Sequence, residues 1–239
     1  MKIALFGYGK MGKEIEAIAL ERGHTITARV DSKNPVSSFD YSDTDVIIEF
    51  SRPESAVENM TFAMDNGIPI VVGTTGWYEE LGQIEATCKE QQGAVLHATN
   101  FSLGVNAFFA VNRYLAKIMN QLDEYSAEVV EIHHTEKLDA PSGTGISLTE
   151  QIIEHHDRYT QWQNDKAEAV SEKNIIPIAS QRLPKVPGTH EVKYKSTIDT
   201  IEIKHTAHNR KGFALGSVLA AEWIKGKTGV YTMQDVLNF

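Results

Sequence analysis

The sequence has little of several features that would assign it to a particular class of protein. One cysteine among 239 residues cannot form an internal disulfide, which fits a reducing compartment. There is no surplus of basic side chains, because 32 acidic residues outnumber 23 basic ones and the formal net charge is −9. This balance argues against nucleic acid or an acidic membrane as a partner, but it leaves room for a local cationic pocket.

Long apolar stretches are also missing. No run approaches the ~18 residues of a membrane span, and the apolar part of the N-terminus is too short for a signal peptide. We therefore expect a cytoplasmic protein without a membrane partner. The 41% of hydrophobic residues that are present can form a core, and the length suits one large domain or two smaller ones.

The first part of the chain alternates short apolar runs with segments of helical periodicity. The runs are rich in β-branched residues and predict strands at 3–6, 25–30, 46–50, 68–72 and 94–97. The segments between them predict helices at 11–22, 54–66 and 78–91. Such alternation gives right-handed βαβ crossovers and a parallel sheet. We predict an α/β domain over 1–104, with a doubly wound parallel sheet.

A different pattern follows. It predicts a helix at 105–122, a strand at 126–133, a helix from about 145 to 156, and strands at 175–182, 190–196 and 200–207. Asp199 lies in the short connection between the last two strands, which favours an antiparallel hairpin. The polar stretch 158–174 predicts a surface loop or a frayed helix. We expect an α+β domain with a mixed or antiparallel sheet over 105–211, and C-terminal helices over 212–239 that return to the first domain.

A glycine-rich turn directly follows the first predicted strand and opens a helix. In G-x-G-x-x-G the glycines permit the tight turn, the approach of the pyrophosphate and close helix–strand packing. This context predicts a Rossmann-type dinucleotide site at Gly7, Tyr8, Gly9, Lys10, Met11 and Gly12. The alternative is a purely structural turn beside a surface aspartate.

Asp31 ends the second predicted strand, where an acidic side chain takes the adenosine ribose hydroxyls. A carboxylate there repels a 2′-phosphate, although Lys33 is close enough in sequence to offset the repulsion. Lys10 within the glycine turn adds another cation near the phosphates. The sequence therefore predicts NADH, or the use of both NADH and NADPH. Loops after two later strands sit at the rim where ligands bind in such sheets, and we expect cofactor contacts from Gly73, Thr74, Thr75, Ala98, Thr99, Asn100 and Phe101.

The most informative stretch, 128–144, joins a predicted strand to a predicted helix. His133 and His134 would point to opposite faces of an extended chain, so at most one donates a proton directly. Histidine's pKa of ~6.5 suits a general acid near neutral pH. Lys137 adds a fixed positive charge, and the helix start at Ser142-Gly143-Thr144 offers donors for a carboxylate.

Ordinary alternatives exist for this cluster. Ser142 or Thr144 could be a simple N-cap and both histidines could be surface residues. A catalytic metal is not expected, because the histidine pair lacks a third ligand at recognisable spacing. Some members of a second group are expected to complete an anion pocket and others to be solvated: Arg182, Lys185, His190, His205, His208 and Arg210.

The whole chain resembles the dihydrodipicolinate reductase family, oxidoreductases of diaminopimelate and lysine biosynthesis. The resemblance is carried by the glycine turn and by EVVEIHHTEKLDAPSGT (128–144), IIEFSRPE (47–54), GTTG (73–76), ATNFSLGVN (98–106) and HTAHNRKGFALG (205–216). Two positions depart from the family pattern. Gly145 stands where the family signature usually has alanine, and Ser32 stands where longer members carry an arginine for the 2′-phosphate.

The resemblance implies hydride transfer from NADH or NADPH to a cyclic dihydrodipicolinate-type dicarboxylate, by a homotetramer built through the C-terminal sheet. It implies His133 as the proton donor, Lys137 as a second catalytic cation, and substrate contacts from His134, Gly143, Thr144 and Arg210. Two other functions stay open. The chain could be a dehydrogenase of an amino acid or a sugar, or a regulator that senses a dinucleotide without turning it over.

Overall fold

The computed structural model describes residues 1–164, 172–209 and 211–239. The chain forms two compact units. The first combines Met1–Leu103 with Lys211–Phe239, and the second is Gly104–Arg210.

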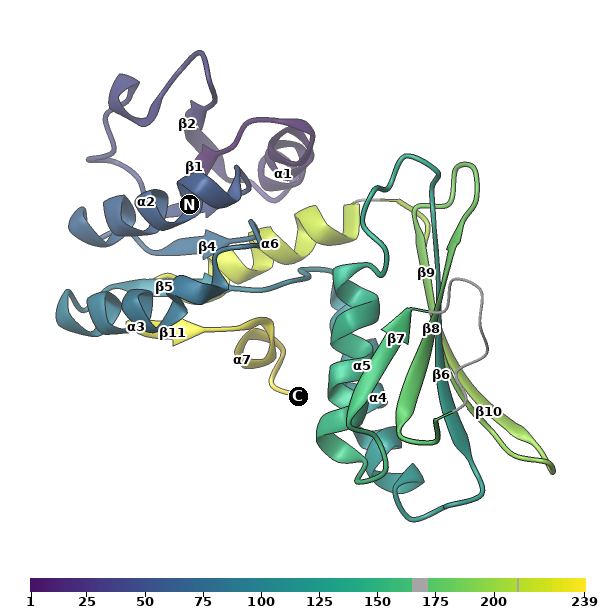
Figure 1. Ribbon diagram of the computed structural model, residues 1–239. Helices are drawn as coiled ribbons and strands as arrows, with labels where there is room; N and C mark the ends of the chain where they lie inside the picture. Colours follow the sequence, from purple (N-terminus) through teal and green to yellow (C-terminus); the bar gives the residue numbers. More distant parts are fainter. Residues whose placement is uncertain (165–171, 210) are drawn as a thin grey trace. The chain divides into compact units, whose positions relative to one another are not determined.

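The first unit is built on a six-stranded sheet in which each pair of neighbours is parallel. The strand order is β11-β5-β4-β3-β1-β2 (Figure 1). The strands are β1 (Lys2–Phe6), β2 (Thr25–Val30), β3 (Val46–Glu49), β4 (Ile70–Val72), β5 (Ala94–His97) and β11 (Gly229–Tyr231).

Helices cover both faces of this sheet, because its central strands are apolar on both sides. One core lies beneath α2 (Pro53–Asp65) and α3 (Leu81–Glu90). The opposite core lies beneath α1 (Lys10–Glu21), α6 (Lys211–Ile224) and α7 (Met233–Leu237). The short 3₁₀ turns are η1 (Val36–Ser38) and η2 (Tyr78–Glu80). The predicted doubly wound parallel sheet is confirmed.

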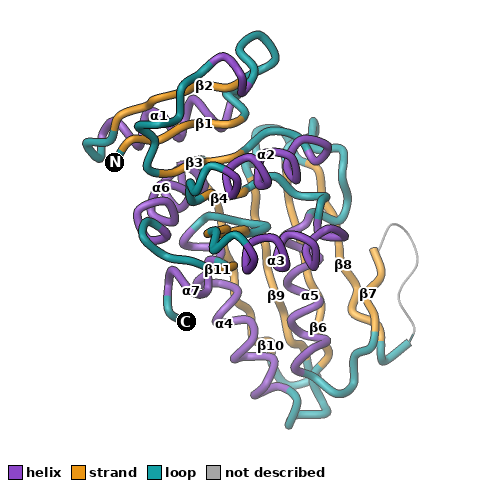
Figure 2. The backbone as a smooth tube through the Cα atoms, turned by 90° about the vertical axis from the view of Figure 1, so that its left-hand side faces the viewer, coloured by secondary structure: helices purple, strands orange, loops and turns teal. Residues whose placement is uncertain are grey.

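The second unit carries a five-stranded mixed sheet in the order β10-β9-β6-β8-β7. Its centre, β6 (Ser126–His133), is antiparallel to β9 (Gly188–Lys195) and parallel to β8 (Ile175–Arg182). The predicted hairpin is confirmed, because β10 (Thr200–Ala207) pairs antiparallel with β9. A core joins this sheet to α4 (Leu103–Met119) and α5 (Gly143–His155), and Figure 2 shows both helices over the sheet.

Two sequence predictions are wrong in part. The polar stretch 158–174 contains a strand, β7 (Gln161–Asn164), which pairs with β8, while residues 165–171 lie outside the described residues. The C-terminal stretch 212–239 is not only helical, since β11 lies between α6 and α7 and pairs with β5. Both strands are short, and pairing with a neighbouring strand decides their conformation rather than their own apolar pattern.

The buried face of β6 leads to the candidate site. Strand alternation turns Ala127, Val129, Glu131 and His133 toward the helices, and all four are buried. The first two belong to the apolar core. The same face therefore changes from apolar to polar at the end of the strand.

Candidate active site

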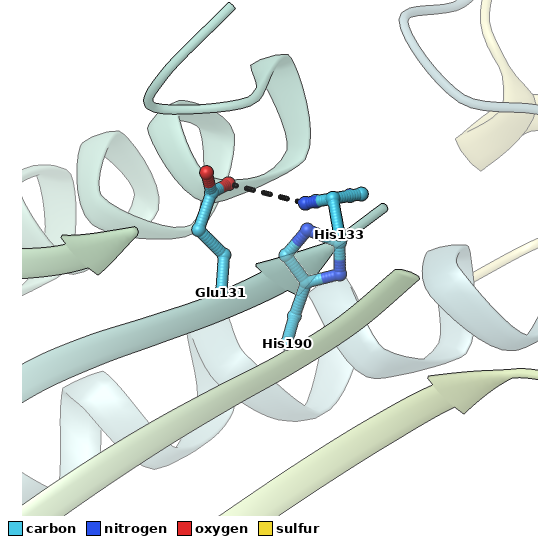
Figure 3. A group of neighbouring side chains, drawn as sticks. All are labelled: Glu131, His133 and His190. Atoms are coloured by element: carbon cyan, nitrogen blue, oxygen red, sulfur yellow. Dashed lines mark ion pairs between the residues drawn. The ribbon is translucent and has the colours of Figure 1, made fainter. Parts of the chain in front are cut away.

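The polar end of the second sheet gathers side chains from three neighbouring strands. Glu131 and His133 share a face of β6. His190 on β9 lies directly opposite Glu131, and Arg182 on β8 lies beside His133. Figure 3 shows Glu131, His133 and His190 turned toward one another. Strand register alone thus brings together residues up to about sixty positions apart in the chain.

The Glu131 carboxylate is completely buried and has several partners. Oε1 accepts from both terminal nitrogens of Arg182 at 3.2 Å, and Oε2 accepts from the backbone N–H of Ser142 at 2.8 Å. Oε2 also lies 3.9 Å from Nδ1 of His133. Burial raises the pKa of Glu131, but the hydrogen bonds from Ser142 and the charge of His133 outweigh it and hold the pKa below its usual value. Glu131 is therefore a buried anion.

The two buried histidines differ in their surroundings. Burial lowers the pKa of His133, Lys137 and Arg182 lower it further, and the charge of Glu131 opposes them. His190 is buried more deeply, which lowers its pKa to about 3 and keeps it neutral near pH 7. Its Nε2 lies 3.2 Å from the Ser142 hydroxyl, and its ring meets that of His133 edge-on at 5.0 Å.

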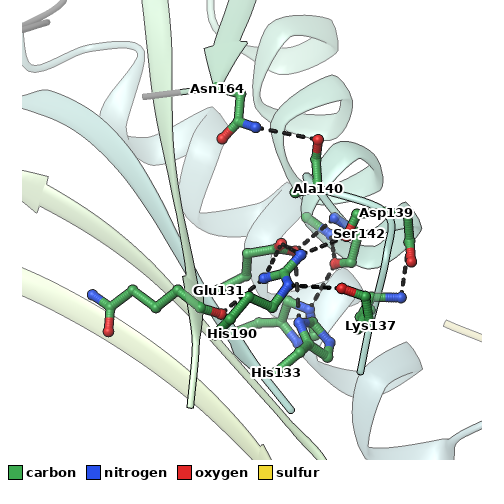
Figure 4. Close-up of polar contacts among 11 residues, drawn as sticks. Glu131, His133, Lys137, Asp139, Ala140, Ser142, Asn164 and His190 are labelled. Atoms are coloured by element: carbon green, nitrogen blue, oxygen red, sulfur yellow. Dashed lines mark hydrogen bonds and ion pairs between the residues drawn. The ribbon is translucent and has the colours of Figure 1, made fainter. Parts of the chain in front are cut away.

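The loop between β6 and α5 is held at several points, as Figure 4 shows for those near Lys137 and Ala140. Lys137 Nζ forms an ion pair with Asp139 at 2.8 Å. The Arg182 guanidinium donates to the backbone carbonyls of Lys137 and Asp139. The side chain of Asn164, at the end of β7, donates to the carbonyl of Ala140 at 3.2 Å. The strand that the sequence did not predict therefore tethers the loop that carries Lys137.

The N-terminus of α5 faces the same cluster. Ser142 is its N-cap, and the Ser142 hydroxyl accepts from the N–H of Gly145 at 3.1 Å. Gly143 and Thr144 form the first turn, where backbone N–H groups can bind an anion. A Cβ on Gly145 would lie 2.9 Å from Oε2 of Glu131, so glycine at this position lets the carboxylate approach the helix.

Glu131, His133 and His190 also lie close enough for a metal ion, with one possible ligand atom from each within 4.8 Å of the others. The charges around these three side chains disfavour the binding of a metal ion. Both oxygens of Glu131 already accept hydrogen bonds, one of them from the cationic Arg182, and Lys137 adds positive charge. The arrangement suits acid–base chemistry better than a divalent cation.

The structure brings His133, Lys137, Gly143 and Thr144 into one region of the second unit. His134 is half-buried just past the end of β6, and Arg210 lies outside the described residues. Glu131 was missed by the sequence analysis. The signal was its spacing, because a carboxylate two residues before His133 must share the inward face of the strand.

In the first unit, the glycine turn has the geometry that its motif predicts. Gly7 has φ +94°, and a Cβ there would lie 2.1 Å from the carbonyl oxygen of Phe50. A Cβ on Gly12 would lie 2.7 Å from the carbonyl oxygen of Gly7, so this position needs glycine for helix–strand packing. Gly9 precedes α1 and has open space where its Cβ would point. The backbone at Gly9 is therefore accessible to a ligand.

Other predicted cofactor residues surround this turn. The Tyr8 hydroxyl bonds to Glu16, which also pairs with Arg29. Lys10 and Met11 begin α1. Oδ1 of Asp31 accepts from the backbone N–H groups of two following residues at 2.9 Å, which lowers the Asp31 pKa. Asp31 is therefore ionised and held in a turn at the end of β2.

The loops after β4 and β5 differ in exposure. Thr74 is buried and its hydroxyl accepts from the N–H of Ser51 at 2.9 Å, while Thr75 and Thr99 are exposed. Asn100 is buried, and its Oδ1 accepts from the N–H of Ser102. Of the other predicted cofactor residues in these loops, Gly73 and Ala98 are half-buried, and the side chain of Phe101 belongs to the core. Phe101 can thus reach a ligand only through its backbone.

These features define a class: an oxidoreductase with a Rossmann-type nucleotide-binding domain and a second, mixed-sheet domain. Within the described residues, no helix has both the length and the apolar character that a bilayer crossing requires. The models of dihydrodipicolinate reductase match the chain in two parts, the N-terminus over residues 1–101 and the C-terminus over residues 104–237. The chain belongs to the dihydrodipicolinate reductase family.

Individual proteins agree with this assignment. The chain is 48% identical to 4-hydroxy-tetrahydrodipicolinate reductase of Christiangramia forsetii, over 100% of this chain and 98% of that protein. It is 35% identical to the enzyme of the same name from Alkaliphilus metalliredigens, over 100% and 99%. The structure of dipicolinate-bound dihydrodipicolinate reductase from Paenisporosarcina sp. TG-14 superimposes with a TM-score of 0.74 at 21% identity, over 97% of each chain. At that identity the superposition supports the fold alone.

Proposed function

We propose that this chain is a 4-hydroxy-tetrahydrodipicolinate reductase of the diaminopimelate and lysine pathway, which reduces a cyclic dicarboxylate to tetrahydrodipicolinate with NADH or NADPH. Full-length similarity to enzymes of that name supports the reaction. The single observation that carries the chemistry is the buried cluster in which an anionic glutamate lies between His133 and the start of α5.

The first unit fits the cofactor. The open space at Gly9 and the N–H groups at the start of α1 suit a pyrophosphate. The Oδ2 atom of Asp31, which the turn does not use, suits the ribose hydroxyls. We assign the carboxamide of the nicotinamide ring to the loops at Gly73–Thr75 and 98–101. When bound, the nicotinamide supplies the hydride.

The second unit supplies the substrate contacts and the proton. The N–H groups of Gly143 and Thr144 bind one carboxylate of the substrate, and His134 and Arg210 are assigned to the remaining polar contacts. Hydride addition moves electron density toward the ring nitrogen, and His133 then delivers a proton to the neighbouring carbon. The ammonium of Lys137 stabilises the negative charge that develops.

Cofactor preference follows from the end of β2. Asp31 favours a free 2′-hydroxyl over a 2′-phosphate, and Ser32 supplies no cation there. Arg29 is held by Glu16 in an ion pair. We therefore propose that NADH is preferred and NADPH is also accepted, with Lys33 offsetting part of the repulsion.

The proposed assembly is a homotetramer formed through the C-terminal sheet, as in the family that the sequence resembles. In the second unit the core lies between the sheet and α4 and α5. Light scattering coupled to size-exclusion chromatography tests this assembly, and a monomer at assay concentration would contradict it.

The decisive assay follows the oxidation of NADH and of NADPH with the cyclic dicarboxylate generated in situ. Turnover with this substrate, and none with amino acids or sugars, supports the proposal. Cofactor oxidation by an amino acid or sugar substrate alone would favour a different dehydrogenase. Cofactor binding without turnover of any of them would favour a sensor.

A further inference from the structure

We propose that Glu131 is a positioning residue, whose carboxylate fixes the proton donor His133 and the anion-binding start of α5 relative to each other. This inference rests on the proposed function for the roles of His133 and of the α5 N-terminus. It assigns to Glu131 a part in the reaction that the side chain performs without touching the substrate.

The burial of Glu131 is the first argument. Its side chain has no exposed surface, and its Oε1 atom accepts two hydrogen bonds from Arg182. Removing a carboxylate from water carries a large desolvation penalty, and apolar replacements of buried ion pairs are often neutral or stabilising. Stability therefore gives no reason for a carboxylate at this position, whereas a role in the site does.

One oxygen atom of Glu131 contacts two functional elements. Oε2 of Glu131 accepts the N–H of Ser142 at 2.8 Å and lies 3.9 Å from Nδ1 of His133. Since Nδ1 faces the carboxylate, Nε2 is the nitrogen left for the substrate. A Cβ on Gly188 would lie 3.3 Å from this Nε2, so the strand opposite has no side chain that fills the space beside it.

Charge is the third argument. The groups that act on His133 come from four elements: Glu131 on its own strand, Lys137 and Asp139 from the loop, Arg182 from β8 and His190 from β9. His190 is neutral, and both Lys137 and Arg182 oppose protonation of His133. Asp139 is more than half exposed and paired with Lys137, so Glu131 is the main group that favours the imidazolium.

The matched pair Glu131→Gln and Glu128→Gln tests the proposal. Both positions lie on β6 and both side chains form an ion pair, but Glu128 pairs with Lys195 at 2.5 Å away from the cluster. Three quantities are compared with the wild type: the His133 pKa from its imidazole NMR signal, the pH profile of kcat, and the Kd for dipicolinate. His133→Gln identifies the NMR signal by its loss.

In Glu131→Gln we expect the His133 pKa and the basic limb of kcat to move about one pH unit lower, because an opposite charge at this distance is removed. Most of the lost kcat should return at low pH, where His133 is protonated again. The Kd for dipicolinate should rise several-fold, while Glu128→Gln leaves all three quantities unchanged. Partial recovery in Glu131→Asp, which keeps the charge, would support a role of that charge.

An unchanged His133 pKa in a folded Glu131→Gln protein would overturn the proposal, and so would a kcat loss that is equal at every pH. Should Glu131→Gln fail to fold, Gly145→Ala perturbs the same carboxylate, since its Cβ would crowd Oε2 at 2.9 Å. In Gly145→Ala we expect the His133 pKa to move in the same direction but by less. An unchanged His133 pKa in this variant would also overturn the proposal. The NMR readout needs no turnover, so an inactive wild type would reject the proposed function and leave this test intact.

Discussion

The two candidate binding regions are built in different ways. The nucleotide region of the first unit is formed by backbone and by small residues, and glycines at its turn leave room for a ligand. The region in the second unit is formed by buried and half-buried polar side chains that contact one another, with Glu131 and Arg182 at its centre. The first region therefore follows from a short local motif, while the second exists only where three strands are in register.

The largest expected effect comes from removing the proposed proton donor or the proposed second catalytic cation. In His133→Gln and in Lys137→Ala we expect kcat to fall about 10²- to 10⁴-fold, because proton transfer and charge stabilisation are lost. The Kd for NADH, measured by fluorescence titration, should be nearly unchanged, since both residues belong to the second unit. A wild-type kcat in either purified variant would remove the assigned role.

The nucleotide region is tested by Gly9→Ala. Its Cβ would enter open space, so the variant should fold normally. The methyl group would, however, occupy the position that we propose for the pyrophosphate. We expect the Kd for NADH to rise about tenfold or more, which is ~1.4 kcal/mol of binding free energy. The control is Gly82→Ala on α3, where a Cβ also meets open space. Equal NADH affinity in both variants would place the cofactor elsewhere.

The buried charge cluster also predicts how stability depends on pH. The pKa of His190 is about 3 in the folded chain against an ordinary 6.5, so between these values the unfolded chain binds a proton that the folded chain does not. This contribution to stability is complete above the ordinary pKa and is lost as the pH falls toward 3, by about 1.4 kcal/mol per pH unit. In His190→Asn, the free energy of unfolding measured with urea should fall less steeply than in the wild type as the pH decreases through this window. An identical slope would contradict a neutral His190.

The smallest expected effect concerns cofactor choice. Asp31→Ser removes the carboxylate that we propose to repel a 2′-phosphate and to accept a hydrogen bond from the ribose hydroxyl. We expect the ratio of kcat/KM for NADPH to that for NADH to rise several-fold, or ~1 kcal/mol. Asp40→Ser, a change at an exposed aspartate whose Oδ1 also accepts a turn N–H, serves as the control. A ratio that stays constant would show that Asp31 does not face the ribose.

Much of this molecule could be predicted from local patterns. Apolar runs located β1, β2, β5, β6, β8 and β10, and the glycine turn was placed correctly before α1. The adjacent histidines, Lys137 and the serine at the start of α5 marked the loop of the candidate site through their types and spacing alone. These features share a cause, since each depends on residues a few positions apart, whose conformations are restricted by local sterics and hydrogen bonding.

The tertiary structure decided the contacts between residues that are far apart in the chain. The short strands β7 and β11 form because each pairs with the edge of a neighbouring strand. Asn164 on β7 then forms a hydrogen bond to Ala140 in the loop. Register places Arg182 and His190 beside Glu131, which turns a mid-strand glutamate into a buried anion facing His133. The sequence by itself determined which chemical groups are available and in which local elements. Only the packed sheet decided which of them meet, because burial and partner charges that shift a pKa come from residues distant in the chain.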